Sequence, residues 1–289
     1  MELQQIKYFR VIARTENISR AAEQLFIAQP SLSQMLKRLE EEIGMPLFDR
    51  NGKKIVLNGA GKIFLKYADE VCQALENAES ELREYSGAEI MDVNISVESA
   101  SLLIPDIIGR IGKAFPRIMP HIFQSCQSDW DLKLDSDVSS LLPESAVQLL
   151  EEPIGIIMPK DHALADKAEI TKQDLRNCDF ISLSPSSNLY QIIAHFCETE
   201  KFAPKISMYV ESPSIMRDLL KMNMGIAFVP QDTWYRFYHD VLLFKIVRDM
   251  PMRRFVRLTC NEQKYQTQAV QSCKNTIIDY FKEYSRKGR

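Results

Sequence analysis

The sequence predicts an α+β protein with more than one domain, and three patterns lead to this class. Residues 1–58 combine short helical patterns with a hairpin signal, residues 59–86 carry one uninterrupted helical pattern, and residues 92–289 alternate short extended segments with helices. The chain has 289 residues, which is more than one compact domain usually holds. We therefore expect a small N-terminal domain, a long helix, a short hinge at residues 87–91 and a larger α/β domain.

The N-terminal domain is organised around two short amphipathic helices joined by a tight corner. Ser19 stands just before the apolar residues of the first of these helices, where its hydroxyl can accept bonds from free backbone N–H groups. Pro30 falls in the first turn of the second helix, where a missing N–H leaves no helix bond unmade. The small pair Ala21-Ala22 allows the two helices to cross closely, and Gly44 is expected to end the second helix.

The second helix has an apolar stripe on one face and a polar face suited to nucleic acid on the other. Leu32, Leu36, Leu39 and Ile43 recur at steps of four, three and four. The opposite face carries small hydroxyls, amides and cations, which can bond base edges and phosphates without blocking entry to a groove. These residues are Gln29, Ser31, Ser33, Gln34, Lys37 and Arg38. An ordinary solvated face is the alternative interpretation of such a pattern.

A basic hairpin follows and favours the nucleic-acid interpretation. Asn51-Gly52 is a strong hairpin-turn signal between two short segments that can pair as strands. Arg50, Lys53 and Lys54 place positive charge on this hairpin, where they can bind phosphates or the minor groove. Residues 1–58 are therefore predicted to form a winged helix-turn-helix domain that binds double-stranded DNA. Its predicted DNA-binding residues are Ser19, Gln29, Pro30, Ser31, Ser33, Gln34, Lys37, Arg50, Lys53 and Lys54.

Residues 59–86 are predicted to form one long linker helix, with Asn58 as its N-cap. Six apolar residues on it recur at alternating steps of four and three, as in a coiled coil. The expected partner of this stripe is the same helix of a second subunit, and packing onto the C-terminal domain is the alternative. A two-fold pair of such domains can read two half-sites on DNA. The predicted dimerisation residues are Phe64, Ala68, Val71, Leu75, Ala78 and Leu82.

The run from Ala21 to Arg50, together with the LNGAGKIFL that follows the hairpin, resembles the DNA-binding end of the LysR-type transcriptional regulators. The resemblance implies a sequence-specific transcriptional regulator, a homodimer or homotetramer, that contacts RNA polymerase as well as DNA and has no catalytic residue. One departure is Ala28, where the family usually has a serine that caps the recognition helix. We therefore expect a helix start that is weaker by roughly 1 kcal/mol.

The resemblance also implies a C-terminal effector-binding domain of two lobes, similar to periplasmic binding proteins. Its predicted parts are lobe I, residues 92–160 and 266–289, and lobe II, residues 161–265. Extended segments are expected at residues 93–97, 122–124, 154–158, 180–183, 205–210, 226–229, 241–246 and 255–261. Helices are expected near residues 103–115, 171–175, 189–200, 214–222 and 267–284.

A small-molecule effector is expected in the cleft between the lobes, at the carboxyl ends of strands and the starts of helices. Serines gather at three such places, and their hydroxyls together with helix-start N–H groups suit a small polar or anionic ligand. Any single one of these serines is also explained as a helix cap. The predicted effector-binding residues are Ser99, Ser101, Ser184, Ser186, Ser187, Ser212 and Ser214.

Two features of the predicted first lobe depart from the family pattern. Only fourteen residues separate Pro116 from Asp131, too few for the strand and helix that the family fits there. Lys133 falls in what should be an apolar strand. The helix that walls the effector cleft is therefore expected to be shortened or absent. The alternative function is a LysR-like DNA-binding protein whose C-terminal domain serves oligomerisation or partner binding.

Composition and residue spacing argue against other functional classes. The formal net charge is −3, but residues 1–58 carry nine Lys and Arg against seven Asp and Glu, so charge does not exclude DNA binding. The four histidines are isolated, without catalytic or metal-ligand spacing, so we expect no enzyme, no metal and no cofactor. The six cysteines show no CxxC spacing and are expected to be free thiols in the cytoplasm, with a redox-sensing pair as the alternative. No apolar run reaches the length of a membrane span.

Overall fold

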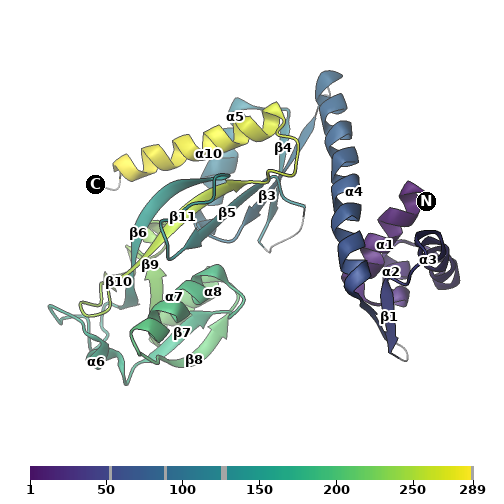
Figure 1. The fold of residues 1–289 in the computed structure, drawn as a ribbon. Helices are drawn as coiled ribbons and strands as arrows, with labels where there is room; N and C mark the ends of the chain where they lie inside the picture. The colour runs from purple at the N-terminus through teal and green to yellow at the C-terminus, as the bar shows by residue number, and fades with distance from the viewer. Residues whose placement is uncertain (52–53, 88–89, 125–128, 288–289) are drawn as a thin grey trace. The chain divides into compact units, whose positions relative to one another are not determined.

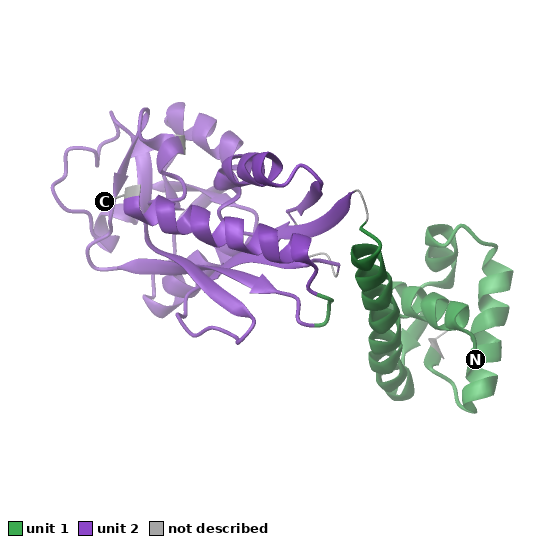
Figure 2. Cartoon of the chain, turned by 90° about the horizontal axis from the view of Figure 1, so that it is seen from above, with its two compact units in different colours: residues 1–87, 263–265 green, residues 88–262, 266–289 purple. Residues whose placement is uncertain are grey.

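A computed structural model describes residues 1–51, 54–87, 90–124 and 129–287 of the chain. The chain divides into two compact units (Figure 2). Residues 1–87 with residues 263–265 form the first unit, and residues 88–262 with residues 266–289 form the second. The first unit has one hydrophobic core and the second unit has two.

The first unit is a winged helix-turn-helix that continues into a long helix (Figure 1). Three helices come first, a two-stranded antiparallel hairpin follows, and the long helix ends the unit. The elements are α1 Leu3–Thr15, α2 Ile18–Gln24, α3 Gln29–Ile43, β1 Phe48–Asn51, β2 Lys54–Leu57 and α4 Gly59–Tyr85. The two helices of the helix-turn-helix, the hairpin and the long helix follow one another in the order that the sequence predicts, and α1 precedes them.

Small and large apolar side chains together fill the core of the first unit. Phe9 of α1 is 1% exposed, and its ring centroid lies 4.9 Å from that of Phe64 on α4. Ala21 of α2 is fully buried, as the close crossing of the helices requires. Leu32 and Leu39 place the apolar stripe of α3 in the same core. Because this stripe is buried, the opposite face of α3 is left to solvent.

Two helix ends confirm the predictions and one corrects them. Gly44 ends α3 in the left-handed region with a φ of 82°, and Asn58 caps α4 by accepting the N–H of Gly61 at 2.9 Å. At the start of α2 the cap is Asn17, whose side chain accepts a backbone N–H at 3.0 Å. The prediction that Ser19 caps this helix is therefore wrong, because Ser19 already lies within the first helical turn.

The hairpin turn also differs from its prediction. The strands pair antiparallel with Asn51 opposite Lys54, so Asn51 lies in β1 and not in the turn. Residues 52–53 connect the strands and lie outside the described residues. The register follows burial, because Phe48 and Ile55 both face the core and a shift of β2 by one residue would turn Ile55 outward.

The second unit is built on a seven-stranded mixed sheet (Figure 1). Its order is β10-β6-β11-β5-β3-β4, and β9 also pairs with β6. β3 runs parallel to β4 and β5, whereas β6 and β11 pair antiparallel with their neighbours. The strands are β3 Met91–Val97, β4 Ile118–Phe123, β5 Leu132–Asp137, β6 Ala146–Pro159, β9 Ala227–Pro230, β10 Leu242–Lys245 and β11 Met252–Cys260.

Helices and a second, smaller sheet complete this unit. Helices α5 Ile104–Ala114 and α10 Gln268–Lys287 pack against each other, and α10 also packs on β3 and β6. The smaller sheet is the parallel pair β7 Asp179–Leu183 and β8 Lys205–Val210. The remaining helices are η1 Ser101–Leu103, α6 Lys172–Leu175, α7 Asn188–Thr199, α8 Pro213–Lys221 and α9 Tyr235–Tyr238. Among the described helices, none is both long and apolar enough to cross a membrane.

The two cores of the second unit define two lobes. The core of lobe I joins residues of β3, β5, α5 and α10, and the core of lobe II joins residues of β7, α7, α8 and β9. Strands β6 and β11 run through both: Leu150 and Val256 belong to the first core, whereas Ile154 and Met252 belong to the second. The chain therefore changes lobe within these strands. The predicted bounds place residues 92–160 in lobe I and residues 161–265 in lobe II. The second half of β6, from Ile154, belongs to the core of lobe II, and the second half of β11, from Val256, belongs to the core of lobe I, so both depart from that assignment.

The short connection in lobe I fits its prediction as far as the structure describes it. β4 ends at Phe123 and β5 begins at Leu132, and none of the described residues between them is helical. Residues 125–128 lie outside the described part of the chain. Lys133 is accommodated in β5 because its ammonium lies 3.1 Å from Glu98 and 3.4 Å from Asp135.

We predict that Gly61→Ala destabilises the first unit by about 1–3 kcal/mol. A Cβ at this position would lie 2.1 Å from the carbonyl oxygen of Leu47 and 2.6 Å from a methyl group of Leu57, so the wing or α4 must shift. Chemical denaturation followed by far-UV circular dichroism measures the change in unfolding free energy.

Gly59→Ala is the matched control, since it lies in the same helical turn with nothing within 4 Å of a new Cβ. We expect it to be neutral or stabilising by up to about 1 kcal/mol. Both tryptophans lie in the second unit, so their fluorescence transition should be the same in both variants. If the two variants lose equal stability, the close approach of α4 to the wing is not as described.

Candidate nucleic-acid interface and lobe junction

The polar face of α3 is open to solvent. Of the six predicted DNA-binding residues on this helix, five are exposed and one, Ser33, is half-buried. The six residues are Gln29, Pro30, Ser31, Ser33, Gln34 and Lys37. The structure therefore brings them to the surface of one helix, with Arg38 exposed beside them. Ser19 is exposed on α2.

The start of α3 has no side-chain cap. Ala28 holds the N-cap position in an extended conformation, with φ −67° and ψ 131°, and its side chain makes no cap bond. Pro30 follows in the first turn. Pro30 has no N–H, and the N–H groups of Ser31 and Leu32 donate to the backbone carbonyl of Ala28 at 3.0 and 3.2 Å, so this helix start uses backbone acceptors in place of a side-chain cap.

The sequence-based list of candidates omits Phe26, which lies in the corner between α2 and α3. Its φ of 54° places it in the left-handed region, and its side chain is 95% exposed. Ser19, Glu23 and Gln29 line the same shallow hollow. An aromatic ring held out of the core at the start of a recognition helix can pack on the methyl group of thymine. The sequence places Phe26 in the corner, but only the backbone geometry shows that it points outward.

Three predicted residues belong to the wing. Arg50 lies on β1 and Lys54 on β2, but their side chains lie outside the described part of the structure. Lys53 lies outside the described residues altogether. Binding of phosphates or the minor groove by these three residues stays a prediction.

Helix α4 has two apolar faces, and one of them packs on the DNA-binding domain of its own chain. Ala68 is 2% exposed, and the ring of Phe64 packs on the same core. An ion pair between Arg10 and Asp69, at 2.6 Å, connects this side of α4 to α1. The prediction assigns Phe64 and Ala68 to the dimer seam, and the structure corrects it, because both side chains contact the core of their own domain.

The second face of α4 carries exposed apolar side chains along its length. Its members lie three or four residues apart and so share one side of the helix. They are Ile63, Tyr67, Val71, Leu75, Ala78 and Leu82, with exposed fractions of 38% at Leu75 to 66% at Ile63 among the large ones. The prediction omits the first two. An exposed apolar stripe of this kind is typical of a helix that pairs with another helix.

A chain of hydrogen bonds joins the two lobes of the second unit, and we call it the lobe junction. The Ser99 hydroxyl, after β3, donates to the Ser136 hydroxyl on β5 at 3.0 Å, and the latter donates to the side-chain oxygen of Asn188 at 2.6 Å. The side-chain amide of Asn188 donates to the Ser136 carbonyl at 2.9 Å. Because Asn188 is the first residue of α7, these bonds connect lobe I to the start of a lobe II helix.

A buried ion pair lies next to the lobe junction. Arg254 on β11 is 2% exposed and Glu152 on β6 is fully buried, with 2.7 Å between guanidinium and carboxylate. The guanidinium also donates to the Thr233 hydroxyl at 2.9 Å and to the Ser136 hydroxyl at 3.4 Å. Glu152 accepts the backbone N–H groups of Thr233 and Asp232 at 2.8 and 2.9 Å. Burial, with the Glu152 charge nearby, raises the pKa of Asp232 above its usual value.

The other predicted effector residues lie mainly at helix starts. Ser187 caps α7 and Ser212 caps α8, each accepting a backbone N–H at 3.2 Å. Ser184 and Ser186 share a hydrogen bond of 3.0 Å, and Ser101 begins η1. Ser214 is the donor to the cap of α8. Of the seven predicted serines, all of which are described, Ser99 is the one that takes part in the lobe junction. Ser187 and Ser212 are helix caps, as the alternative interpretation of these serines states.

The titratable side chains give little support to metal or redox chemistry in the described part of the chain. There, no group of three or more His, Cys, Asp or Glu side chains is arranged to hold a metal ion. Five cysteines are free, and Cys126 lies outside the described residues. Burial lowers the pKa of His162, whose ring nitrogen accepts the N–H of Leu164 at 3.2 Å in a structural turn.

Two family models match the chain, and together they span both units. The model described as the bacterial regulatory helix-turn-helix protein, lysR family, matches residues 3–62. The LysR substrate binding domain matches residues 93–282, well over half of the chain. The chain belongs to the LysR family of transcriptional regulators. It is therefore a LysR-type DNA-binding regulator with an effector-binding domain, and a C-terminal domain that serves assembly alone is not favoured.

Curated relatives of this LysR-type regulator match it over nearly its whole length. The uncharacterized regulator YybE of Bacillus subtilis is 27% identical over 298 residues, which cover 98% of this chain and 100% of the relative. AlsR of the same organism is 30% identical over 261 residues, which cover 85% of this chain and 86% of AlsR.

Solved structures share the fold. Full-length OxyR from Pseudomonas aeruginosa has a TM-score of 0.64 at 18% identity, covering 96% of this chain and 94% of OxyR. Full-length CbnR in complex with its target DNA has a TM-score of 0.58 at 16% identity, covering 96% of this chain and 99% of CbnR. The effector-binding domain of QuiR in complex with shikimate has a TM-score of 0.55 at 20% identity, covering 67% of this chain and 98% of that domain.

We predict that Arg254→Met destabilises the second unit by about 3–5 kcal/mol, because it leaves the Glu152 carboxylate buried without its cation. Denaturation followed by tryptophan fluorescence measures the loss, since both tryptophans lie in this unit.

The next residue on β11 provides the control. Arg253 pairs with Glu151 at 2.8 Å, but its side chain is 63% exposed, so Arg253→Met should change stability by no more than about 1 kcal/mol. Similar losses in the two variants would show that burial does not decide the effect.

Proposed function

We propose that two copies of this LysR-type regulator bind one operator through paired α3 helices, under the control of a small molecule that binds at the lobe junction. The observation that carries the proposal is the row of exposed amide, hydroxyl and cationic side chains on α3, opposite its buried stripe. A helix with this division of faces fits the major groove while its apolar side stays in the domain core.

The proposed roles of the DNA-binding residues follow from their chemistry. Gln29 and Gln34 have side-chain amides that can bond adenine bidentately, and Lys37 can bond guanine or a phosphate. Phe26 is proposed to contact a thymine methyl group beside them. Arg50, Lys53 and Lys54 on the wing are proposed to bind phosphates or the minor groove. The complex of CbnR with its target DNA supports this use of the N-terminal domain.

The exposed face of α4 is the proposed dimer interface. Two α4 helices paired through the residues from Ile63 to Leu82 would hold two recognition helices about a two-fold axis. A dimer of such dimers gives the homotetramer that the family resemblance implies. Rearrangement of the subunits would then change DNA bending and contact with RNA polymerase.

The lobe junction is the proposed effector site. Its hydroxyl and amide groups belong to different lobes, and Arg254 lies beside them. A small ligand with hydroxyl or carboxylate groups can compete for these bonds and so favour a different arrangement of the lobes. The complex of the QuiR effector-binding domain with shikimate supports a polar carboxylate as the ligand class.

A panel of small hydroxy acids, shikimate among them, tests the effector proposal by the melting temperature of the full chain. A ligand at one hundred times its Kd should stabilise the second unit by about 2.7 kcal/mol. Ser99→Ala should weaken that ligand, whereas Ser80→Ala, on α4 of the first unit, should not. A stabilising ligand that is indifferent to Ser99→Ala would place the site elsewhere.

Two substitutions test the DNA-binding roles. Gln34→Ala should reduce discrimination between a selected duplex and a shuffled duplex by about 1–3 kcal/mol, because a base contact is lost. Lys53→Ala should weaken both duplexes alike and lower the slope of affinity against salt by about 1, because a phosphate contact is lost. Fluorescence anisotropy over a salt series measures both quantities. The roles would be wrongly assigned if the two variants changed affinity for both duplexes in the same way.

A further inference from the structure

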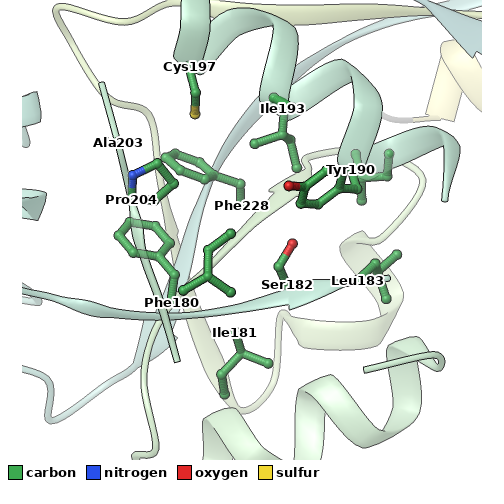
Figure 3. Close-up of a pocket in the computed structure, with 13 residues that line it drawn as sticks. Phe180, Ile181, Ser182, Leu183, Tyr190, Ile193, Cys197, Ala203, Pro204 and Phe228 are labelled. Carbon is green, nitrogen blue, oxygen red and sulfur yellow. The ribbon is translucent and has the colours of Figure 1, made fainter. Parts of the chain in front are cut away.

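An apolar cavity lies within lobe II, and of its wall residues Leu183 directly precedes Ser184 in the sequence and Leu189 directly follows Asn188. It lies between α7 and the sheet of β7 and β8, and its volume is about 220 Å³ (Figure 3). Phe180 and Phe228 form one part of its wall, and Leu189 and Ile193 of α7 form another. No charged side chain is among the residues that line it. The cavity is partly open to solvent, because Ala203 in its wall is exposed and Ser182 and Tyr190 are half-buried.

The size of the cavity limits the ligand that fits it. A cavity of about 150 Å³ lined by leucine, isoleucine and phenylalanine stays dry and takes up benzene. The larger volume here therefore admits a six-membered ring with one or two additional heavy atoms.

Two hydroxyl groups give the apolar wall a polar edge. The side chains of Ser182 on β7 and Tyr190 on α7 both line the cavity (Figure 3). A hydrogen bond with Tyr209 engages the Tyr190 hydroxyl and raises its pKa. For the Ser182 hydroxyl, no hydrogen-bond partner is found among the described residues. One hydroxyl donor or acceptor is thus available to a molecule in the cavity.

The thiol in the wall stays neutral. Cys197 of α7 is 7% exposed, and its sulfur points from the helix toward the cavity (Figure 3). Burial raises the pKa of this thiol to about 11, so the thiolate is scarce at neutral pH. A neutral wall without counter-charge disfavours an ionised ligand, because the ligand would lose its hydration without compensation.

We propose that this cavity is a second ligand site, which binds a small neutral molecule made of one apolar ring and one hydroxyl group. The ring lies among Phe180, Ile193 and Phe228, and the hydroxyl bonds Ser182. Binding itself does not depend on the proposed effector site. The consequence of binding does rest on the proposed effector site. Helix α7 forms a wall of the cavity and begins at Asn188 of the lobe junction, so a ligand that shifts this helix acts on the bonds between the lobes.

Phenol, toluene and benzoate are the probes, titrated calorimetrically into the full chain. Phenol should bind about 5-fold more tightly than toluene, which has nearly the same shape but no hydroxyl, because one hydrogen bond contributes about that factor. Benzoate should bind at least about 10-fold more weakly than phenol. In Ser182→Ala the advantage of phenol over toluene should disappear. Benzoate binding as tightly as phenol, or an unchanged phenol advantage in Ser182→Ala, overturns the proposal.

Ala194→Leu tests the location, because the added side chain occupies the cavity. It should abolish binding of phenol and toluene while the tryptophan fluorescence transition and DNA affinity persist. Ser99→Ala at the lobe junction should retain phenol binding, because Ser99 does not line the cavity, and any change in the Kd of phenol measures the reciprocal coupling between the two sites. If the lobe junction proves not to be the effector site, phenol is still expected to bind in the cavity. Phenol binding that survives Ala194→Leu, or that Ser99→Ala removes, places phenol outside the cavity.

The native cysteine gives a readout that needs no substitution. Saturating phenol should slow modification of Cys197 by methyl methanethiosulfonate at least about 5-fold, since the ligand covers the sulfur. Cys178, which does not line the cavity, is the internal control and should react at an unchanged rate. Equal rates at Cys197 with and without phenol contradict occupancy of the cavity.

Discussion

The close packing of α4 against the helix-turn-helix is the constraint on which the DNA-binding half depends. Gly61 lies against the Leu47 carbonyl, Phe64 packs edge-on to Phe9, and Arg10 pairs with Asp69. These contacts use one side of the helix and leave its other apolar side exposed. One rigid helix thus connects each recognition helix to the proposed dimer interface. In the proposed dimer, the distance between two half-sites would follow from packing inside each chain.

The effector-binding half depends on a different interaction. Strands β6 and β11 supply residues to both lobe cores, and the buried pair of Arg254 and Glu152 joins them. A buried pair of this kind adds little net stability compared with apolar side chains, but it strongly disfavours arrangements that separate its charges. The hydroxyl of Ser136 contacts both this pair and Asn188 of α7. A ligand at the lobe junction or in the cavity beside α7 would therefore shift α7 relative to strands β6 and β11, which the buried pair holds together.

Local chemistry made some features predictable from sequence and left others undetermined. Gly44 and Asn58 are fixed by the backbone needs of helix ends. The prediction of Ser19 as the cap of α2 failed because Asn17, two residues earlier, is also a good cap residue and holds that position. Apolar periodicity found α4, but it could not distinguish the face that Phe64 and Ala68 bury from the face that Ile63 and Tyr67 expose. The pair of Arg254 and Glu152 joins strands 102 residues apart, and no local pattern reveals such a contact.

In vitro selection of duplexes by the full chain tests the central claim most directly, because it requires both base reading and pairing of two recognition helices. Starting from random DNA, the account predicts enrichment of a two-fold symmetric sequence whose half-sites are separated by about one helical turn or a multiple of it. Recovery of unrelated sequences, or of a single half-site without symmetry, would contradict it.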